Sequence, residues 1–163
     1  MPPDIVRDLG LLALGTRMRR LGELLYAHTQ GIMQEFDLSI PASQHPFLAA
    51  LDREGSLTVG ELAEAVGITQ PGATRTIGQL VEAGLVEMAV CDGDQRRRTI
   101  SLSPAGREFV SFCKSNVWPA VDAAVRDLCA DLDGPLLDQL AAIEDGLARK
   151  PLVERINDNG KQP

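Results

Sequence analysis

The chain has 163 residues, of which 44% are apolar, 24% are charged and only 4% are aromatic, and its formal net charge is −7. This length suits one domain with a hydrophobic core of its own, built mainly from aliphatic side chains. The apolar run at residues 9–16 is too short to cross a bilayer, and no signal-peptide cleavage site follows it. We therefore expect a cytoplasmic protein.

Residues that commonly carry chemistry are few and scattered in this sequence. The three cysteines, Cys91, Cys113 and Cys129, form no Cys-x-x-Cys pair, and the only histidines are His28 and His45. This composition predicts reduced cysteines and no metal site. The sequence also contains no Gly-rich phosphate loop and no nucleophile elbow. We therefore predict neither an enzyme nor a bound cofactor.

The positive charge is concentrated in one segment of an otherwise acidic chain. Residues 69–107 contain five arginines and four acidic residues, a net charge of +1, whereas the remainder has a net charge of −8. The densest point is the triplet Arg96, Arg97 and Arg98. Because nucleic-acid binding depends on local rather than total charge, the acidic total does not exclude DNA as a partner.

The first segment, from about Asp4 to Phe36, has the periodicity of one amphipathic helix. Its apolar positions recur at alternating spacings of three and four residues, which is typical of a helix that packs on another helix. The stripe comprises Leu11, Leu14, Met18, Leu21, Leu25, His28 and Ile32. We predict one long helix that ends before a break at residues 37–39.

Residues 39–102 carry the start and stop signals of three shorter helices, followed by a change of period. The predicted N-caps are Ser39 or Ser43, Thr58 and Thr69, and the predicted stops are Gly55, Gly67 and Gly84. Apolar and polar residues then alternate on both sides of the turn-forming residues 91–95. This pattern predicts a β-hairpin whose returning strand is rich in arginine.

Two more helices are predicted after the hairpin. The fifth begins at Pro104 and runs towards residue 130, with a kink at Pro119, because proline removes a donor and clashes with the preceding turn. The sixth begins after residues 133–135 and ends at Pro151. The polar tail from Asn157 is expected to be irregular.

The order helix, glycine-containing turn, helix and hairpin is that of a winged helix-turn-helix. The predicted fold is therefore mainly α with a small β-hairpin wing. The short connection through Gly67 lets the fourth helix cross the third and project outward, where it could enter a DNA major groove.

Two stretches resemble the MarR family of transcriptional regulators. One is residues 68–86, around the fourth helix; the other is the wing pattern Asp94-x-Arg96, followed after three residues by Ile100-x-Leu102-Ser103-x-x-Gly106. The resemblance covers residues 39–107 by motif and the flanking helices by layout. Met88 departs from the family, which commonly has a basic residue there, so one phosphate contact per subunit is missing.

The resemblance implies a single MarR-like domain over residues 1–163. Its DNA-binding part would span 39–107, and residues 4–36 and 104–150 would form dimerisation helices. Family members are typically homodimeric repressors that bind a pseudo-palindromic site on double-stranded DNA. Small molecules release most of them, and cysteine oxidation releases some.

The outward face of the fourth helix supplies the candidate base-reading residues. If Ala73, Ile77 and Leu80 face inward, a polar and glycine-containing set faces outward. In this set Gln70 and Thr74 are expected to read base edges. The set comprises Thr69, Gln70, Pro71, Gly72, Thr74, Arg75 and Gln79.

Within this set, Arg75 is expected to contact guanine or phosphate, and Gly72 to permit close approach to the DNA. The alternative, that these are simply solvated polar residues, stays open for Gln79.

The wing supplies the second group of candidates. Arg96 is expected to enter a narrow minor groove, and Asp94 to hold its guanidinium by a charge-assisted hydrogen bond. Arg97 and Arg98 point to opposite faces of the strand, so we expect one of them to contact phosphate. The alternative is a solvated run of charge.

The resemblance also implies an effector pocket between the first, second and fifth helices, which His28, His45 and Trp118 could border. For His28 the alternative is a core histidine with one satisfied nitrogen.

Two other functions compete with a ligand-released repressor. One is a winged-helix protein-interaction module without DNA binding, which the acidic total charge would suit. The other is a thiol-based redox-sensing regulator. Arg75 and the arginine triplet argue against the first. Against the second, no cysteine lies near the start of the first helix, where the family's peroxide sensors carry theirs.

Overall fold

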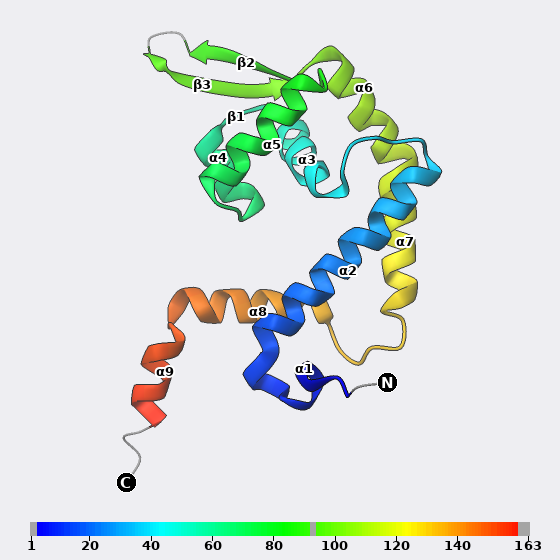
Figure 1. Cartoon of the computed structure of the whole chain (residues 1–163). Helices are drawn as coiled ribbons and strands as arrows, with labels where there is room; N and C mark the ends of the chain where they lie inside the picture. Colours follow the sequence, from blue (N-terminus) through cyan, green and yellow to red (C-terminus); the bar gives the residue numbers. More distant parts are fainter. Residues whose placement is uncertain (1–2, 92–93, 160–163) are drawn as a thin grey trace. The chain divides into compact units, whose positions relative to one another are not determined.

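The computed structural model describes the backbone of residues 3–91 and 94–159, and the side chains of residues 3–89 and 98–155. The chain forms two compact units, Met1–Ala123 and Ala124–Pro163. The predicted fold class is confirmed, because helices dominate and a small antiparallel sheet completes the first unit (Figure 1). None of the described helices is both long enough and apolar enough to span a membrane.

The N-terminal segment is not the single helix that its periodicity predicts. It forms α1 (Ile5–Asp8), a 3-10 turn η1 (Gly10–Ala13) and α2 (Leu14–Glu35). Gly10 has a φ of +55°, a left-handed conformation that an α-helix cannot accommodate, so the helix is interrupted there. Two hydrogen bonds of 2.9 and 3.0 Å from Arg20 to the Asp4 carboxylate hold α1 against α2.

The helix-turn-helix has the predicted caps at Thr58 and Thr69, but the predicted N-cap at Ser39 or Ser43 is wrong. After the 3-10 turn η2 (Ala42–Gln44) come α3 (His45–Glu54), α4 (Val59–Val66) and α5 (Gln70–Glu82). Helix α3 begins after Gln44, without a side-chain cap, because the 3-10 turn η2 leads directly into it. Gly55, Gly67 and Gly84, the three predicted stops, all have positive φ angles. Positive φ is unfavourable for residues with a Cβ, which explains why glycine ends each of these helices.

The sheet contains one strand that the sequence did not predict. The hairpin strands β2 (Val86–Cys91) and β3 (Asp94–Leu102) are joined by β1 (Ser56–Thr58), and the strand order is β1-β3-β2. In the register, Thr58 of β1 pairs with Thr99 and Leu57 with Ile100. Three residues are too few to show an alternating pattern, so β1 is visible only through its pairing with β3.

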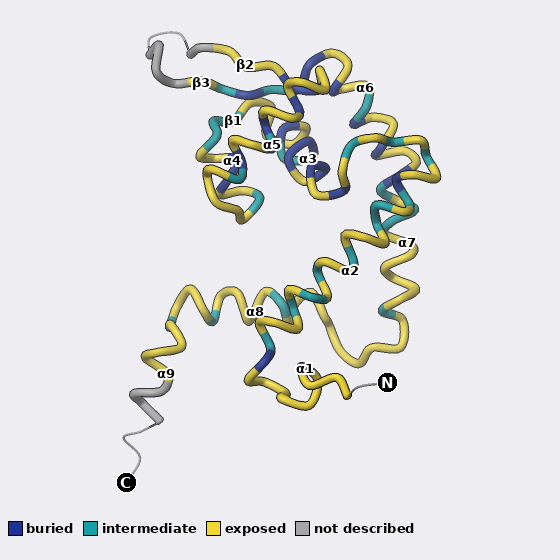
Figure 2. The backbone as a smooth tube through the Cα atoms, viewed as in Figure 1, coloured by how far each residue is buried: buried dark blue, intermediate teal, exposed yellow. Residues whose placement is uncertain are grey.

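The main hydrophobic core lies inside this winged part. Leu48, Leu62, Leu80 and Ile100 are completely buried and come from α3, α4, α5 and β3 respectively. Figure 2 shows the buried backbone positions gathered around α3, α4, α5 and the sheet, whereas α1, α8 and the described start of α9 are mostly exposed. The core therefore fixes the orientation of α5 against α3, α4 and the sheet.

A second, smaller core lies where α2 ends. It is made of Met33, Ala42, Cys113 and Val117. Phe109 and Trp118 pack against both cores, so the two are contiguous.

The predicted kink at Pro119 takes the form of a π-helical turn. The fifth predicted helix is α6 (Pro104–Phe112), a π turn (Cys113–Val117) and α7 (Trp118–Leu128) in succession. Pro119 has no N–H and crowds the carbonyl four residues earlier, inside this π turn, which accounts for the widened hydrogen-bonding pattern.

The remaining helices are α8 (Leu136–Arg149) and α9 (Leu152–Asn159). The predicted end of the sixth helix at Pro151 is confirmed, but α9 was not predicted, and the expectation of an irregular backbone from Asn157 is wrong as far as Asn159, where α9 ends. Its amphipathic run is only eight residues long and directly follows proline, so sequence periodicity gives it little weight.

Candidate DNA-binding interface

Two side-chain caps fix the geometry of the helix-turn-helix. Thr58 and Glu61 form a capping box at the start of α4: the Thr58 N–H donates to Glu61 Oε2 at 2.7 Å, and the Glu61 N–H donates to Thr58 Oγ1 at 3.3 Å. Thr69 caps α5 by accepting from the Gly72 N–H at 3.4 Å. These caps satisfy helix-terminal donors and set the point from which α5 projects.

Helix α5 has one buried and one exposed face, as the sequence predicts. Ala73, Ile77 and Leu80 are 0–3% exposed and belong to the main core. Within the described part of the chain Arg75 has no ion-pair partner, so its guanidinium is available to an external anion. On the other face, the exposed residues are Thr69, Gln70, Pro71, Thr74, Arg75 and Gln79, and Gly72 is half-buried.

Some of these exposed polar groups already have partners within the protein. The Thr74 hydroxyl donates to the Gln70 carbonyl at 3.0 Å, which leaves it chiefly an acceptor towards solvent. The Gln79 Oε1 atom accepts a hydrogen bond from Gln44 Nε2 at 2.8 Å. Sequence reasoning missed Gln44, since no local pattern links residues 35 positions apart.

Packing within the protein gives a second reason for glycine at position 72, besides the predicted close approach to DNA. A Cβ at this position would lie 3.2 Å from Thr69 Oγ1 and 3.6 Å from Ile68 Cδ1. Glycine therefore leaves room for the capping threonine, whether or not a backbone of DNA approaches it.

The wing is described in part. The side chains of Asp94, Arg96 and Arg97 lie outside the described residues, although their backbone belongs to β3. Arg98 is exposed and stands on the same face of β3 as the buried Ile100, beyond the edge of the core.

Met88, the family departure, is 43% exposed and pairs with Ile100. A basic side chain at this position would reach solvent.

The base of the wing is locked to the end of α5. The Ser103 hydroxyl donates to the Gly84 carbonyl at 2.6 Å and accepts from the Gly106 N–H at 2.9 Å. A Cβ on Gly106 would lie only 1.9 Å from the Leu85 carbonyl oxygen. The glycine of the wing signature thus permits a backbone approach that no other residue allows.

Of the three residues predicted to border an effector pocket, the structure brings two together. The Trp118 indole N–H donates to His45 Nδ1 at 3.1 Å, and the Phe109 ring lies 5.7 Å from the His45 ring. His45 is 5% exposed, and its buried Nε2 has no hydrogen-bond partner among the described residues. His28 is exposed on α2 and takes no part in this contact.

The environment of His45 favours the neutral imidazole. Burial lowers the pKa of His45, and the backbone of Ile40 opposes that shift only in part. A neutral ring is also what the geometry requires, because Nδ1 accepts a hydrogen bond and a protonated imidazole has no acceptor.

The described cysteines differ in burial. Cys113 is completely buried in the second core, and burial raises the pKa of its thiol to about 11. Cys129 is half-buried, and the side chain of Cys91 lies outside the described residues. A thiol with a raised pKa is a poor nucleophile, since only the thiolate reacts.

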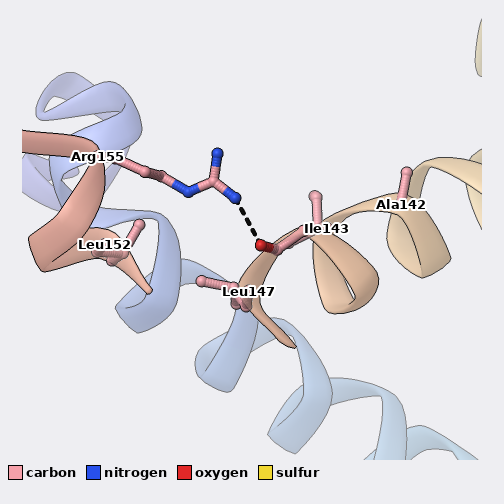
Figure 3. A pocket seen from close by; sticks show the side chains of 6 residues that line it. Ala142, Ile143, Leu147, Leu152 and Arg155 are labelled. Atoms are coloured by element: carbon pink, nitrogen blue, oxygen red, sulfur yellow. Dashed lines mark hydrogen bonds between the residues drawn. The ribbon is translucent and has the colours of Figure 1, made fainter. Parts of the chain in front are cut away.

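A pocket of about 270 Å³ lies within the second unit, between α8 and α9 (Figure 3). Ile143, Leu147 and Leu152 give it an apolar lining. Arg155 donates to the carbonyls of Gly146 and Lys150 at 2.5 and 3.0 Å. These bonds cap the end of α8, so the guanidinium serves the helix terminus.

A projecting helix with a buried aliphatic face, followed by a sheet and hairpin, defines the chain as a winged helix-turn-helix protein. The comparisons with known proteins show which proteins this fold resembles. The model of the MarR family matches residues 37–97. The resemblance to the MarR family predicted from the sequence is therefore confirmed, and the chain has the fold of a MarR family transcriptional regulator.

The solved structures similar to this chain extend the match beyond the winged part. A MarR family regulator from Silicibacter pomeroyi is 26% identical, with a TM-score of 0.59 over 90% of this chain and 96% of that chain. BldR from Sulfolobus solfataricus is 18% identical, with a TM-score of 0.66 over 91% and 100%. Bordetella bronchiseptica BpsR is 19% identical, with a TM-score of 0.63 over 89% and 93%. These relatives are regulators rather than enzymes.

Proposed function

We propose that the chain is a homodimeric repressor that binds a pseudo-palindromic operator on double-stranded DNA. The observation that carries this proposal is the exposed face of α5, where Gln70, Thr74 and Arg75 stand opposite the buried stripe. A major groove admits such a helix, and its N-terminal residues reach the base edges. Arg96 of the wing enters the neighbouring minor groove, with Asp94 and either Arg97 or Arg98 in support.

Dimerisation is supported by apolar side chains that the single chain leaves in solvent. In the first unit, Leu11 and Leu12 are 86% and 85% exposed. In the second unit, Leu137 and Leu152 are 78% and 65% exposed. Such large exposed aliphatic side chains favour burial against a second copy, because extended apolar patches are rare on the surface of a folded monomer. Two copies place two α5 helices on half-sites about 10–10.5 base pairs apart, or a multiple of that.

Release by a small molecule is the regulatory part of the proposal. The DNA binding of BpsR is regulated by 6-hydroxynicotinic acid. In the present chain, the buried Nε2 of His45 beside Trp118, unpartnered within the described part of the chain, offers a polar contact that a small molecule could satisfy. A thiol switch is disfavoured at Cys113, because burial raises its pKa.

A mobility-shift assay on DNA from upstream of the protein's own gene tests the proposal. We expect a shifted band that unlabelled copies of the same fragment displace and unrelated DNA does not. Absence of any shift at micromolar protein and low salt would contradict DNA binding. It would favour the alternative of a winged-helix protein-interaction module, which the net charge of −7 suits.

A further inference from the structure

The four residues Ala42–His45, which we call the junction segment, make polar contacts with three separate helices. The Ala42 N–H donates to Gln30 Oε1 of α2 at 2.8 Å. Gln44 Nε2 donates to Gln79 Oε1 of α5 at 2.8 Å. His45 Nδ1 accepts from the Trp118 indole of α7 at 3.1 Å.

The junction segment is packed too tightly to absorb a movement of one helix by itself. Ala42, Gln44 and His45 are 7%, 6% and 5% exposed, and only Ser43 points to solvent. Ala42 belongs to the second core, while His45 opens α3, whose Phe47 and Leu48 lie in the main core. Close-packed interiors pass on displacements because no free volume takes them up.

The three contacted helices have different tasks under the proposed function. Helices α2 and α7 belong to the segments expected to dimerise, whereas α5 is the helix expected to read DNA. Ordinary core packing does not require three polar contacts from three of four consecutive residues. Each of the three contacts is at least partly buried, so each costs free energy if its partner moves away.

We propose that the junction segment couples the arrangement of α2 and α7 to the orientation of the recognition helix α5. Gln44 is the positioning residue in this coupling, because its buried side chain donates the hydrogen bond that fixes Gln79 on α5. The proposal rests on the proposed function for its biological meaning, since the coupled output is operator binding. The physical coupling between α5 and α7 is a property of the free protein and can be measured without DNA.

Trp118 is the only tryptophan of the chain and is itself one end of the coupling, so its fluorescence reports on the junction. Gln79→Met removes the acceptor on α5 and keeps the side chain's length. We expect it to change the emission and acrylamide quenching of Trp118 in the free protein. Gln79→Glu keeps an acceptor for Gln44 and should restore both to the wild-type values.

Two control variants separate coupling from general disturbance. Gln34→Met makes the same substitution at an exposed position of α2, and Ser43→Ala alters the one exposed residue of the junction segment. Both should leave Trp118 fluorescence unchanged. Circular dichroism melts confirm that every variant is folded. Wild-type fluorescence in a folded Gln79→Met protein would overturn the proposal, whatever the protein does with DNA.

Operator binding gives the second readout. Gln44→Met should weaken operator binding roughly three- to tenfold per subunit, the range expected when one hydrogen bond is removed. The double variant Gln44→Met with Gln79→Met should be no weaker than Gln79→Met alone, because Gln79→Met has already removed the interaction that Gln44 makes. Additive effects would overturn the assigned role of Gln44. Failure of the wild-type protein to bind DNA would instead remove the proposed function, and the fluorescence result would still decide the coupling.

Discussion

Aliphatic side chains are buried in the winged part but largely exposed in the terminal helices. Leu48, Leu62 and Leu80 of the winged part are completely buried within one chain. Leu11 and Leu12 of the N-terminal segment are more than four-fifths exposed, although the same residue type recurs there at helical spacing. A periodic apolar stripe therefore predicts a buried face, but it does not say whether the same chain or a second copy buries it.

The largest expected effect tests whether the winged part depends on backbone approach as well as on side-chain packing. Gly106→Ala would place a Cβ 1.9 Å from the Leu85 carbonyl oxygen, so α6 must shift away from the end of α5. We expect the free energy of unfolding to fall by about 3 kcal/mol or more. Urea denaturation measures it.

Gly78→Ala is the matched control for this substitution. Gly78 lies within α5, and a Cβ there would meet no described atom within 4 Å. Alanine has the higher helix propensity, so this variant should be more stable than wild type by about 0.5–1 kcal/mol. Equal destabilisation of the two variants would refute the close approach as the cause.

The terminal helices should respond to substitution through assembly rather than folding. Leu11→Ala together with Leu12→Ala removes apolar area that is exposed in the single chain and, by our proposal, buried in the dimer. We expect weaker dimerisation by about 1.5–3 kcal/mol for each fully buried leucine that is replaced. Sedimentation should show twice the 17.5 kDa chain mass for wild type and a shift towards the monomer for the variant.

Leu48→Ala is the matching substitution in the main core. It should lower the free energy of unfolding by about 2–5 kcal/mol, whereas the terminal substitutions should weaken the dimer. A stable wild-type monomer at micromolar concentration would contradict the assignment of the exposed leucines to a dimer interface.

The two elements expected to contact DNA should differ in what they read. Arg75→Ala should cost more on the operator than on random DNA, by about 1–3 kcal/mol per site if Arg75 contacts a guanine. Arg96→Ala should weaken binding to both DNAs. It should also flatten the salt dependence of affinity by roughly one unit for each phosphate that is no longer neutralised, and so by about two per dimer. Titrations at several salt concentrations measure both.

Equal weakening on both DNAs for Arg75→Ala would make it a phosphate anchor. Base reading would then fall to Gln70 and Thr74.

Titration of His45, which lies at the contact between the two cores, should make the free energy of unfolding depend on pH. Its folded pKa lies below the ordinary value of about 6.5, so the unfolded chain takes up the proton more readily. Stability contributed by the neutral ring is therefore present above that value and is lost as pH falls through it. The slope cannot exceed about 1.4 kcal/mol per pH unit for one group.

His45→Gln removes this titration, so its stability between pH 7.5 and 5.5 should change less than that of wild type. Denaturation midpoints across this range provide the measurement. The same slope in both proteins would mean that another group titrates.

Oxidation is the treatment for which we expect no effect on operator binding. Mild peroxide should leave operator binding intact, because the Cys113 thiol is completely buried and its pKa is raised to about 11. A mobility-shift assay before and after treatment tests this. Loss of binding that a reductant restores would revive a redox-sensing function and point to Cys91 or Cys129.

Local signals predicted the elements of the winged part well. Thr58, Thr69 and Gly67 act through neighbours three or four residues away, so their roles are readable in sequence, and the structure confirms all three. The exposed face of α5 followed from the buried one for the same reason. The break at Gly10 was missed, because a single glycine is tolerated within a helix and no local sequence signal marks this one as left-handed.

Contacts between distant residues explain the other omissions. The Gln44–Gln79 hydrogen bond joins residues 35 positions apart and has no sequence pattern. His45 and Trp118 are 73 positions apart, and only the family resemblance placed them at one site. Strand β1 is defined by its partner rather than by its own residues. The wing signature identified Gly106 but not why glycine is required there. The reason is the close approach of the Leu85 carbonyl oxygen, which leaves no room for a Cβ.

Thr58 is both the last residue of β1 and the N-cap of α4, and it pairs with Thr99 on the strand that carries the wing arginines. The helix-turn-helix and the base of the wing are therefore joined directly, which would fix the spacing between the helix proposed to enter the major groove and the wing proposed to enter the minor groove. Inserting one base pair between the sequences that the two elements touch would rotate one of them out of reach. The operator should tolerate changes of base more readily than changes of length within a half-site.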